Sequence, residues 1–173
     1  RAHDQRPDLH RRGAIPIVDF RPNWAVPWKR WNMSYEQYVD RFIEEVNPCL
    51  LLNCHYAIMA DGSSRDVFYD NIEMFRAKAL ERNIGLMGFS LVTPHTFPKS
   101  PQIDYRTPSE SDLRWSVYSY LAYGAQGIWY YNWRIDNNGP FGDALVDFKT
   151  GEPTPTYALV AALNQEILTI GPA

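Results

Sequence analysis

Polar side chains that can act in catalysis or ligand binding end several short apolar runs of this chain. Asp19, Asn53, His55 and Asn132 each come at or near the end of a run of aliphatic or aromatic residues. A carboxylate can serve as a general acid or base, and amide and imidazole groups exchange hydrogen bonds with hydroxyl groups. The pattern therefore predicts a binding or catalytic site at the ends of these runs.

Asp19 is the one carboxylate at the end of any of these runs, so it is the candidate catalytic residue. The alternative is that it pairs with Arg21 or caps the following loop. Asn53 and His55 share strand parity, which favours an inward-facing pair that binds hydroxyl groups or orients a carboxylate. The alternative for these two residues is a hydrogen-bonded structural role.

Aromatic residues accompany the polar groups, and an aromatic face can stack on the C–H face of a pyranose ring. Small-ligand pockets commonly combine such apolar walls with a few polar groups. The candidate substrate-binding residues are Asn23, Trp24, Asn53, His55, Tyr56, His95, Tyr131, Asn132 and Trp133. Core packing competes with a binding role for the neighbouring Trp129 and Tyr130.

Other chemistries have weaker support in the sequence. His3, Asp4 and His10 belong to an unpatterned basic lead-in, so no metal site is expected there. No glycine-rich phosphate-binding turn follows an apolar run, and no cofactor is expected. Ser90 lacks the flanking glycines of a nucleophile elbow, which argues against serine hydrolase chemistry.

Charge and hydropathy narrow the class of partner. The net charge of −3 is scattered along 173 residues, so no nucleic-acid partner is expected. No run approaches the roughly 18 to 20 apolar residues of a membrane span, and the first residues hold no apolar signal core. We therefore expect a soluble chain with no membrane partner. Cys49 and Cys54 lie five apart in one run and face opposite sides, so they are not expected to bridge, and the redox compartment stays open.

Four apolar runs predict the strands of a parallel sheet. They span 14–20, 49–56, 84–92 and 126–133, and their apolar character covers both faces, as in strands buried on two sides. Their starts recur about every 35 to 42 residues, a spacing that fits repeated strand, loop, helix and loop. The 45% hydrophobic composition can fill one core.

Helical periodicity follows each of these runs. Ser34 with Gln37 forms a capping-box start, Asn83 is the predicted terminator of the second helix, and Ser109 begins a third helix. The predicted helices run from Ser34 to before Asn47, from about Val67 to Asn83, from Ser109 to Gly124, and from about Thr156 to Gly171. We expect residues 1–13 to be a lead-in and 14–173 to be a single domain.

The long loops follow strands and the short ones precede them, as in barrel enzymes whose sites lie at the carboxyl ends of the strands. We therefore predict an α/β fold of the TIM-barrel type, a (βα)₄ half barrel. The alternative is a small open doubly wound sheet, and strand order and helix placement distinguish the two. Trp24, Trp28 and Trp31 form either a sugar platform or a cover over the open barrel mouth.

Two stretches carry a family resemblance. Residues 108–133, which include the turn from Leu121 to Ile128 and the aromatic strand after it, are one; residues 144–167, with Gly151–Tyr157 and the helix after it, are the other. They resemble the final strands and closing helix of glycosidase-like (β/α)₈ barrels, in particular barrel β-galactosidases and related bacterial glycoside hydrolase-like proteins. The resemblance implies that the predicted strands are strands five to eight of such a barrel.

The resemblance also implies a carbohydrate-active protein with a saccharide ligand, and a secreted or periplasmic location fits the family. Retaining members use an acid/base Glu after strand four, which this chain lacks, and a nucleophile Glu at the end of strand seven. Here that strand, near 84–92, has no carboxylate, whereas the chemistry needs two. Whether the chain is an enzyme is therefore left open, and the alternative is a non-catalytic sugar-binding or structural module. An incomplete barrel exposes edges, so we expect a homo-oligomer or an N-terminal half barrel as partner.

Overall fold

The computed structural model describes residues 17–25, 32–100 and 102–171. They form an α/β domain around one parallel four-stranded sheet, with strand order β1-β2-β3-β6. The strands are β1 (Asp19–Phe20), β2 (Leu50–Cys54), β3 (Gly85–Leu91) and β6 (Gly127–Tyr131), and a small antiparallel pair consists of β4 (His95–Thr96) and β5 (Asp104–Tyr105). Each main strand lies within one predicted run. Because the strands pair in chain order, the predicted sequential order is confirmed. Residues 1–16, which include the lead-in, lie outside the described residues.

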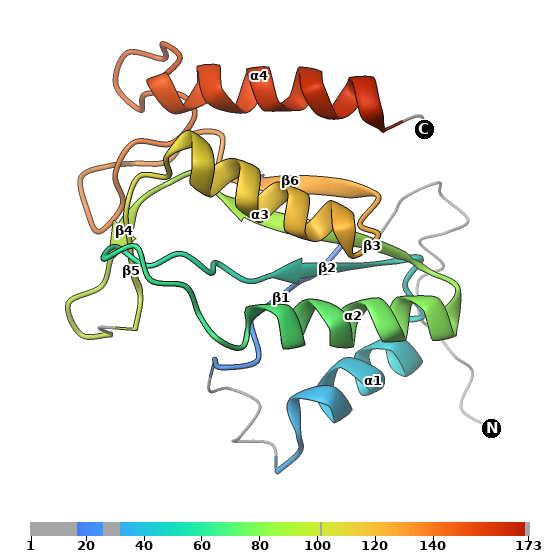
Figure 1. Ribbon diagram of the computed structural model, residues 1–173. Helices are drawn as coiled ribbons and strands as arrows, with labels where there is room; N and C mark the ends of the chain where they lie inside the picture. The colour runs from blue at the N-terminus through green and yellow to red at the C-terminus, as the bar shows by residue number, and fades with distance from the viewer. Residues whose placement is uncertain (1–16, 26–31, 101, 172–173) are drawn as a thin grey trace, which may run out of the picture.

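Four helices alternate with the main strands, and in Figure 1 they succeed one another in chain order. They are α1 (Tyr35–Val46), α2 (Phe68–Arg82), α3 (Glu110–Ala122) and α4 (Pro155–Ile170). The Ser34 side chain accepts the backbone N–H of Gln37, and Asn83 ends α2 in the left-handed conformation at φ 52°. The predicted capping box and terminator are confirmed, because both satisfy backbone groups that a helix end leaves without partners.

All four helices cover the same face of the sheet. The ring of Phe20 on β1 lies 4.8 Å from Phe42 of α1 and 5.3 Å from Phe75 of α2. On the last strand of the sheet, Tyr130 donates a hydrogen bond to Asn164 of α4. Register along the sheet places these strand residues on one side, where Tyr120 of α3 also packs. The doubly wound alternative is therefore wrong.

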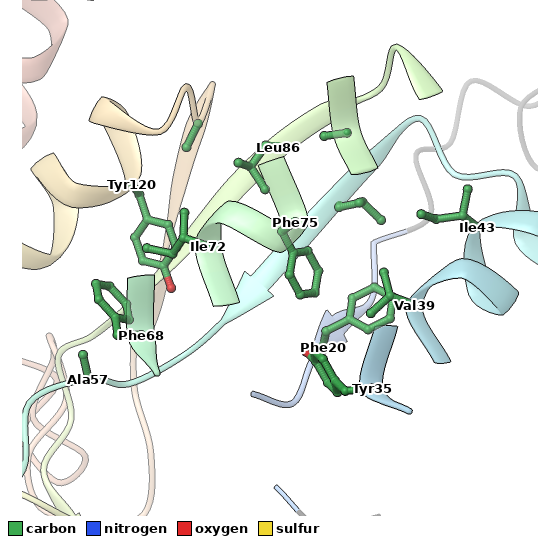
Figure 2. Packing of buried hydrophobic residues seen from close by; sticks show 13 residues of the cluster. Phe20, Tyr35, Val39, Ile43, Ala57, Phe68, Ile72, Phe75, Leu86 and Tyr120 are labelled. Carbon is green, nitrogen blue, oxygen red and sulfur yellow. The ribbon is translucent and has the colours of Figure 1, made fainter. Parts of the chain in front are cut away.

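The main core fills the space between this face and the helices. Figure 2 shows Phe20, Tyr35 and Val39 at one end of the cluster and Phe68, Ile72 and Tyr120 at the other. Burial of aromatic and aliphatic side chains is the dominant favourable contribution to folding. A second cluster, around Val92, Leu113, Val117, Leu145, Val160 and Leu163, attaches α3 and α4 to the end of the sheet.

Gly88 allows α3 to approach β3 closely. A Cβ atom at this position would lie 2.2 Å from Cγ of Tyr120, whose side chain is completely buried. We expect Gly88→Ala to lower the free energy of unfolding by about 1 to 3 kcal/mol, because the ring cannot move freely in a packed core. Chemical denaturation measures the change.

Two controls make this prediction specific. Gly127→Ala on the neighbouring strand places its Cβ 3.1 Å from the flexible end of Met87, so a smaller loss is expected. In a Tyr120→Ala background the Gly88→Ala change should lose most of its cost, a coupling of about 1 kcal/mol or more. Equal costs in the two backgrounds would show that the ring is not the obstacle.

The opposite face of the sheet carries a separate set of apolar side chains. Leu52, Met87, Phe89 and Trp129 lie on it by strand alternation and register. The Trp129 ring stacks on Phe89 at 6.4 Å, yet 46% of Trp129 is exposed. Trp129 is the exposed member of this set, whereas Leu52 and Phe89 are buried, and the self-association expected from the sequence stays a prediction. Within the described residues, no helix has the length and apolar character needed to cross a membrane.

Candidate functional site

A cavity of about 920 Å³ lies at the carboxyl end of the parallel sheet. Loops after all four main strands contribute to its wall, because parallel strands direct their carboxyl ends to the same edge. In Figure 1 this edge lies on the side of β4 and β5. The described lining residues are Arg21, Pro22, Trp24, Ala25, Cys54, Tyr56, Arg65, His95, Phe97, Ser100, Gln102, Ile103, Tyr105, Tyr131 and Phe141.

Aromatic side chains form much of the wall, and four of the predicted site residues meet there. Tyr56, after β2, has its ring centroid 5.9 Å from His95, 5.6 Å from Tyr105 and 6.0 Å from Tyr131. His95 also lies 5.3 Å from Phe141, in the loop after β6. The remaining predicted member of the wall is Trp24, described below. Segments far apart in the sequence therefore build one continuous aromatic surface.

His95 is a neutral imidazole with a defined tautomer. Its Nδ1 lies 3.0 Å from the carbonyl oxygen of Thr93, and since a carbonyl only accepts, Nδ1 carries the proton. Burial lowers the pKa of His95, and the hydrogen bond to Thr93 opposes this effect. The neutral form is favoured at neutral pH, so Nε2 is the nitrogen available to accept a hydrogen bond from a ligand hydroxyl.

Cys54 and Tyr56 are uncharged groups in the wall. Burial raises the pKa of the Cys54 thiol to about 12, and the charge of Asp19 acts in the same direction. Burial likewise raises the pKa of Tyr56, with smaller contributions from Cys54 and Asp19. A thiol in this state is a poor nucleophile, because the thiolate is the reactive form. These residues can donate hydrogen bonds but do not provide covalent chemistry.

Asp19 lies close to the cavity without lining it. Strand alternation places its side chain on the sheet face opposite the helices, in register with Leu52, and it is exposed. Its charge contributes to the raised pKa of Tyr131 as well, where burial is the largest cause. The predicted catalytic residue is thus the carboxylate that borders this site from β1.

Arg65 is the principal residue that sequence reasoning missed. Its guanidinium lies 3.9 Å from the centroid of the Trp24 ring, while its Nε donates to the backbone carbonyl of Tyr56 at 3.3 Å. One terminal nitrogen donates to the Tyr105 hydroxyl at 3.0 Å and to the Gln102 carbonyl. Arg65 therefore holds three loops around the cavity. In the sequence it follows Ser63-Ser64 in a polar loop, where an arginine is ordinarily solvated.

The prediction that Asn53 and His55 face inward is wrong. Both are buried on the helix side, where Asn53 Nδ2 donates to the Asn71 carbonyl at 3.3 Å and His55 Nδ1 lies 2.9 Å from Asn71 Oδ1. The Tyr120 hydroxyl lies 3.3 Å from the Asn53 carbonyl and side-chain oxygens. Strand alternation correctly predicted that the two side chains lie on the same side of the sheet. Their hydrogen bonds to α2 show that this is the side covered by the helices. Their role is structural, the alternative stated for them.

Three further predicted residues lie outside the cavity wall. Trp133 is 60% exposed, and its ring lies 5.9 Å from Tyr157 in a separate groove along α4. The Asn132 backbone N–H donates to Thr93 Oγ1 at 3.0 Å, and the peptide bond before Asn132 is cis. Asn23 is half-buried in the loop that supplies Trp24. Trp133 therefore belongs to the edge of the sheet and not to the site.

The charge of the wall is positive. Arg21 and Arg65 line the cavity, and the lining residues that the structure describes include no aspartate or glutamate. No group of three metal-binding side chains was found in the described parts of the chain. Trp28, Trp31, His3, Asp4 and His10 lie outside the described residues. The arrangement can stack against a ring and exchange hydrogen bonds, but its described wall does not present the carboxylate pair that glycoside hydrolysis uses.

The comparisons add no assignment to this geometry. No protein-family model, no curated protein and no solved structure matches the chain. The function must therefore be inferred from the cavity itself.

Proposed function

We propose that this chain is the carboxyl-terminal half of a glycosidase-like barrel and that it binds a saccharide in the cavity at the strand ends. The sequential parallel order β1-β2-β3-β6 and the placement of all helices on one face support the half-barrel interpretation. The resemblance of residues 108–133 and 144–167 to glycosidase barrels supports it independently. In such architectures the ligand lies at the carboxyl ends of the strands.

One observation carries the saccharide assignment: aromatic and imidazole rings from all four strand-end loops line a single cavity. Trp24, Tyr56, His95 and Tyr131 come from the loops or strand ends of β1, β2, β3 and β6 respectively. Flat rings stack on the apolar faces of a pyranose, while the hydroxyl and imidazole groups at their edges bind its hydroxyls. The volume of about 920 Å³ is in the range of small-ligand pockets.

Binding is better supported than hydrolysis by residues of this chain alone. A retaining mechanism places two carboxyl groups about 5 to 5.5 Å apart, on either side of the scissile bond. Asp19 is the one carboxylate that the sequence placed at a strand end, and it borders the cavity. Asp19 stays a candidate acid or base, and a second carboxylate would have to come from another part of the protein.

The test is calorimetric titration of the chain with a panel of monosaccharides and oligosaccharides, neutral and acidic. Tyr131→Leu keeps an apolar side chain but removes the flat ring, so we expect the dissociation constant to rise about five- to tenfold. Trp133→Leu is the matched control, because Trp133 is an exposed aromatic residue after the same strand but outside the cavity wall. Its affinity should equal that of the unmodified chain.

Two results would overturn the proposal: no saccharide binding by the folded chain, or unchanged affinity in Tyr131→Leu. An aryl-glycoside turnover assay on the intact parent protein, with and without Asp19→Asn, examines the enzyme alternative. Turnover that Asp19→Asn abolishes would establish a hydrolase with Asp19 in its mechanism. Saccharide binding without turnover would establish the non-catalytic binding module.

A further inference from the structure

We propose that the cavity selects a saccharide that carries a carboxylate, a uronic acid, and that Arg65 and Arg21 bind this group. The inference rests on the proposed saccharide site and adds the class of ligand. It starts from the charge of the wall, where two guanidinium groups occur and the described lining includes no acidic residue. A cavity that concentrates one sign of charge attracts ligands of the opposite sign.

Arg65 has its charge and one donor group available in the cavity. Its Nε and Nη2 are held by Tyr56, Gln102 and Tyr105, whereas Nη1 donates to none of the described residues. Its bonding partners are carbonyl and hydroxyl oxygens, and the Trp24 ring covers one face of the guanidinium. None of these groups carries a formal charge. A ligand carboxylate would therefore supply the missing counter-charge.

Arg21 reinforces this positive charge from the loop after β1. It is exposed, lines the cavity, and forms no ion pair within the described part of the chain. Asp19 is the nearby opposing charge, but its side chain lies outside the cavity wall, at the exposed end of β1. The two arginine charges exceed the single charge of the bordering aspartate, so the net charge around the ligand position is positive.

The rest of the wall explains why the anion should be part of a sugar ring. The rings of Tyr56 and Tyr131, 6.0 Å apart, provide a stacking surface, and a carboxylate on a pyranose projects from the ring edge. A guanidinium donates charge-assisted hydrogen bonds to a carboxylate and also to sulfate and phosphate oxygens, so the sulfated sugar in the experiment below distinguishes the carboxylate from these anions.

The experiment compares matched pairs of probes by calorimetry at low ionic strength. The pairs are methyl β-glucuronide with methyl β-glucoside, and methyl β-galacturonide with methyl β-galactoside; glucose 6-sulfate provides the anionic sugar without a carboxylate. We expect at least one uronide to bind about tenfold more tightly than its neutral partner, because a charge-assisted hydrogen bond of about 1.5 kcal/mol corresponds to that ratio. Added salt should reduce the preference.

Variants separate the charge from the loop contacts. Arg21→Gln removes one of the two positive charges of the wall and should weaken uronide binding about threefold or more, with a smaller effect on glucoside binding. Arg65→Lys keeps the positive charge but loses the planar fork, and it should lose most of the uronide preference. Arg76→Gln, on the exposed surface of α2, is the matched control and should change neither affinity.

The outcomes distinguish the two proposals. Equal affinity for uronide and neutral sugar would overturn the carboxylate inference and leave the saccharide site standing. Equal affinity for uronide and sulfate would overturn the selection of a carboxylate among anions. Failure of every probe and of the wider saccharide panel would overturn the proposed function itself.

Discussion

Replacing Phe75 with alanine is expected to lower the free energy of unfolding by about 3 to 5 kcal/mol, the usual cost of truncating a buried aromatic residue. Phe75 lies on α2 and is completely buried, with its ring 5.3 Å from Phe20 and 6.3 Å from Tyr35. It connects α2 to β1 and to α1, so its loss leaves a cavity where three elements meet. Chemical denaturation with a fitted midpoint and slope measures the change.

Leu80→Ala is the matched control for this prediction. Leu80 lies on the same helix but is 66% exposed, so its truncation should change the free energy of unfolding by less than about 0.5 kcal/mol. A cost below about 1 kcal/mol for Phe75→Ala, or equal costs for the two variants, would contradict the packing in Figure 2.

Acidification is expected to destabilise the fold through His55. Burial lowers the pKa of His55 to about 4, although the hydrogen bond to Asn71 acts in the opposite direction. In the unfolded chain the imidazole takes up its proton near pH 6.5, so the unfolded state binds more protons between these two values. The stability is therefore complete above about pH 6.5 and falls by up to about 3 kcal/mol as the pH approaches 4.

The measurement is the free energy of unfolding as a function of pH for the unmodified chain and for His55→Asn. Asparagine keeps an N–H donor for Asn71 Oδ1 but does not titrate, so the variant should show a shallower loss between pH 6.5 and 4. His95, whose pKa is also lowered, remains in both proteins and cancels in the comparison. Parallel stability curves for the two proteins would show that His55 is not the group responsible.

His55 also affects the candidate binding site. His55 and Asn53 fix the end of β2 against α2, and Tyr56 and Arg65 extend from this end into the cavity wall. The end of β2 and the loop after it therefore contribute side chains both to the core and to the wall of the cavity. Loss of stability at low pH should therefore be accompanied by loss of saccharide affinity.

Local sequence signals determined the elements of this protein. Apolar runs placed β2, β3 and β6, and the Ser34–Gln37 and Ser109–Asp112 capping boxes marked the starts of two helices. These features depend on residues close together in the chain, because strand alternation and helix capping are local hydrogen-bonding and burial effects. The predicted strand 14–20 shortened to Asp19–Phe20 within the described residues. The parallel order followed from the repeating spacing, since each crossover needs a helix.

Tertiary structure decided which side chains meet. The antiparallel pair of β4 and β5 brings His95 opposite Tyr105, inside a loop that showed no strand pattern in the sequence. Arg65 joins the site through contacts with Trp24 and Tyr105, 41 and 40 positions away in the sequence, which no local pattern encodes.

The orientation of individual side chains also required the packed fold. Strand alternation predicted that Asn53 and His55 share a face of the sheet. It did not predict that Asn71 forms hydrogen bonds with both of them on that face. In the sequence, Trp133 is an aromatic residue at a strand end. In the structure its ring packs against Tyr157 of α4. The sequence alone thus determined the order of the elements and the presence of a polar, aromatic strand end, because those are set by local burial and hydrogen bonding. Only the packing of the helices on the sheet decided which of those residues form the cavity, because that depends on contacts between distant segments.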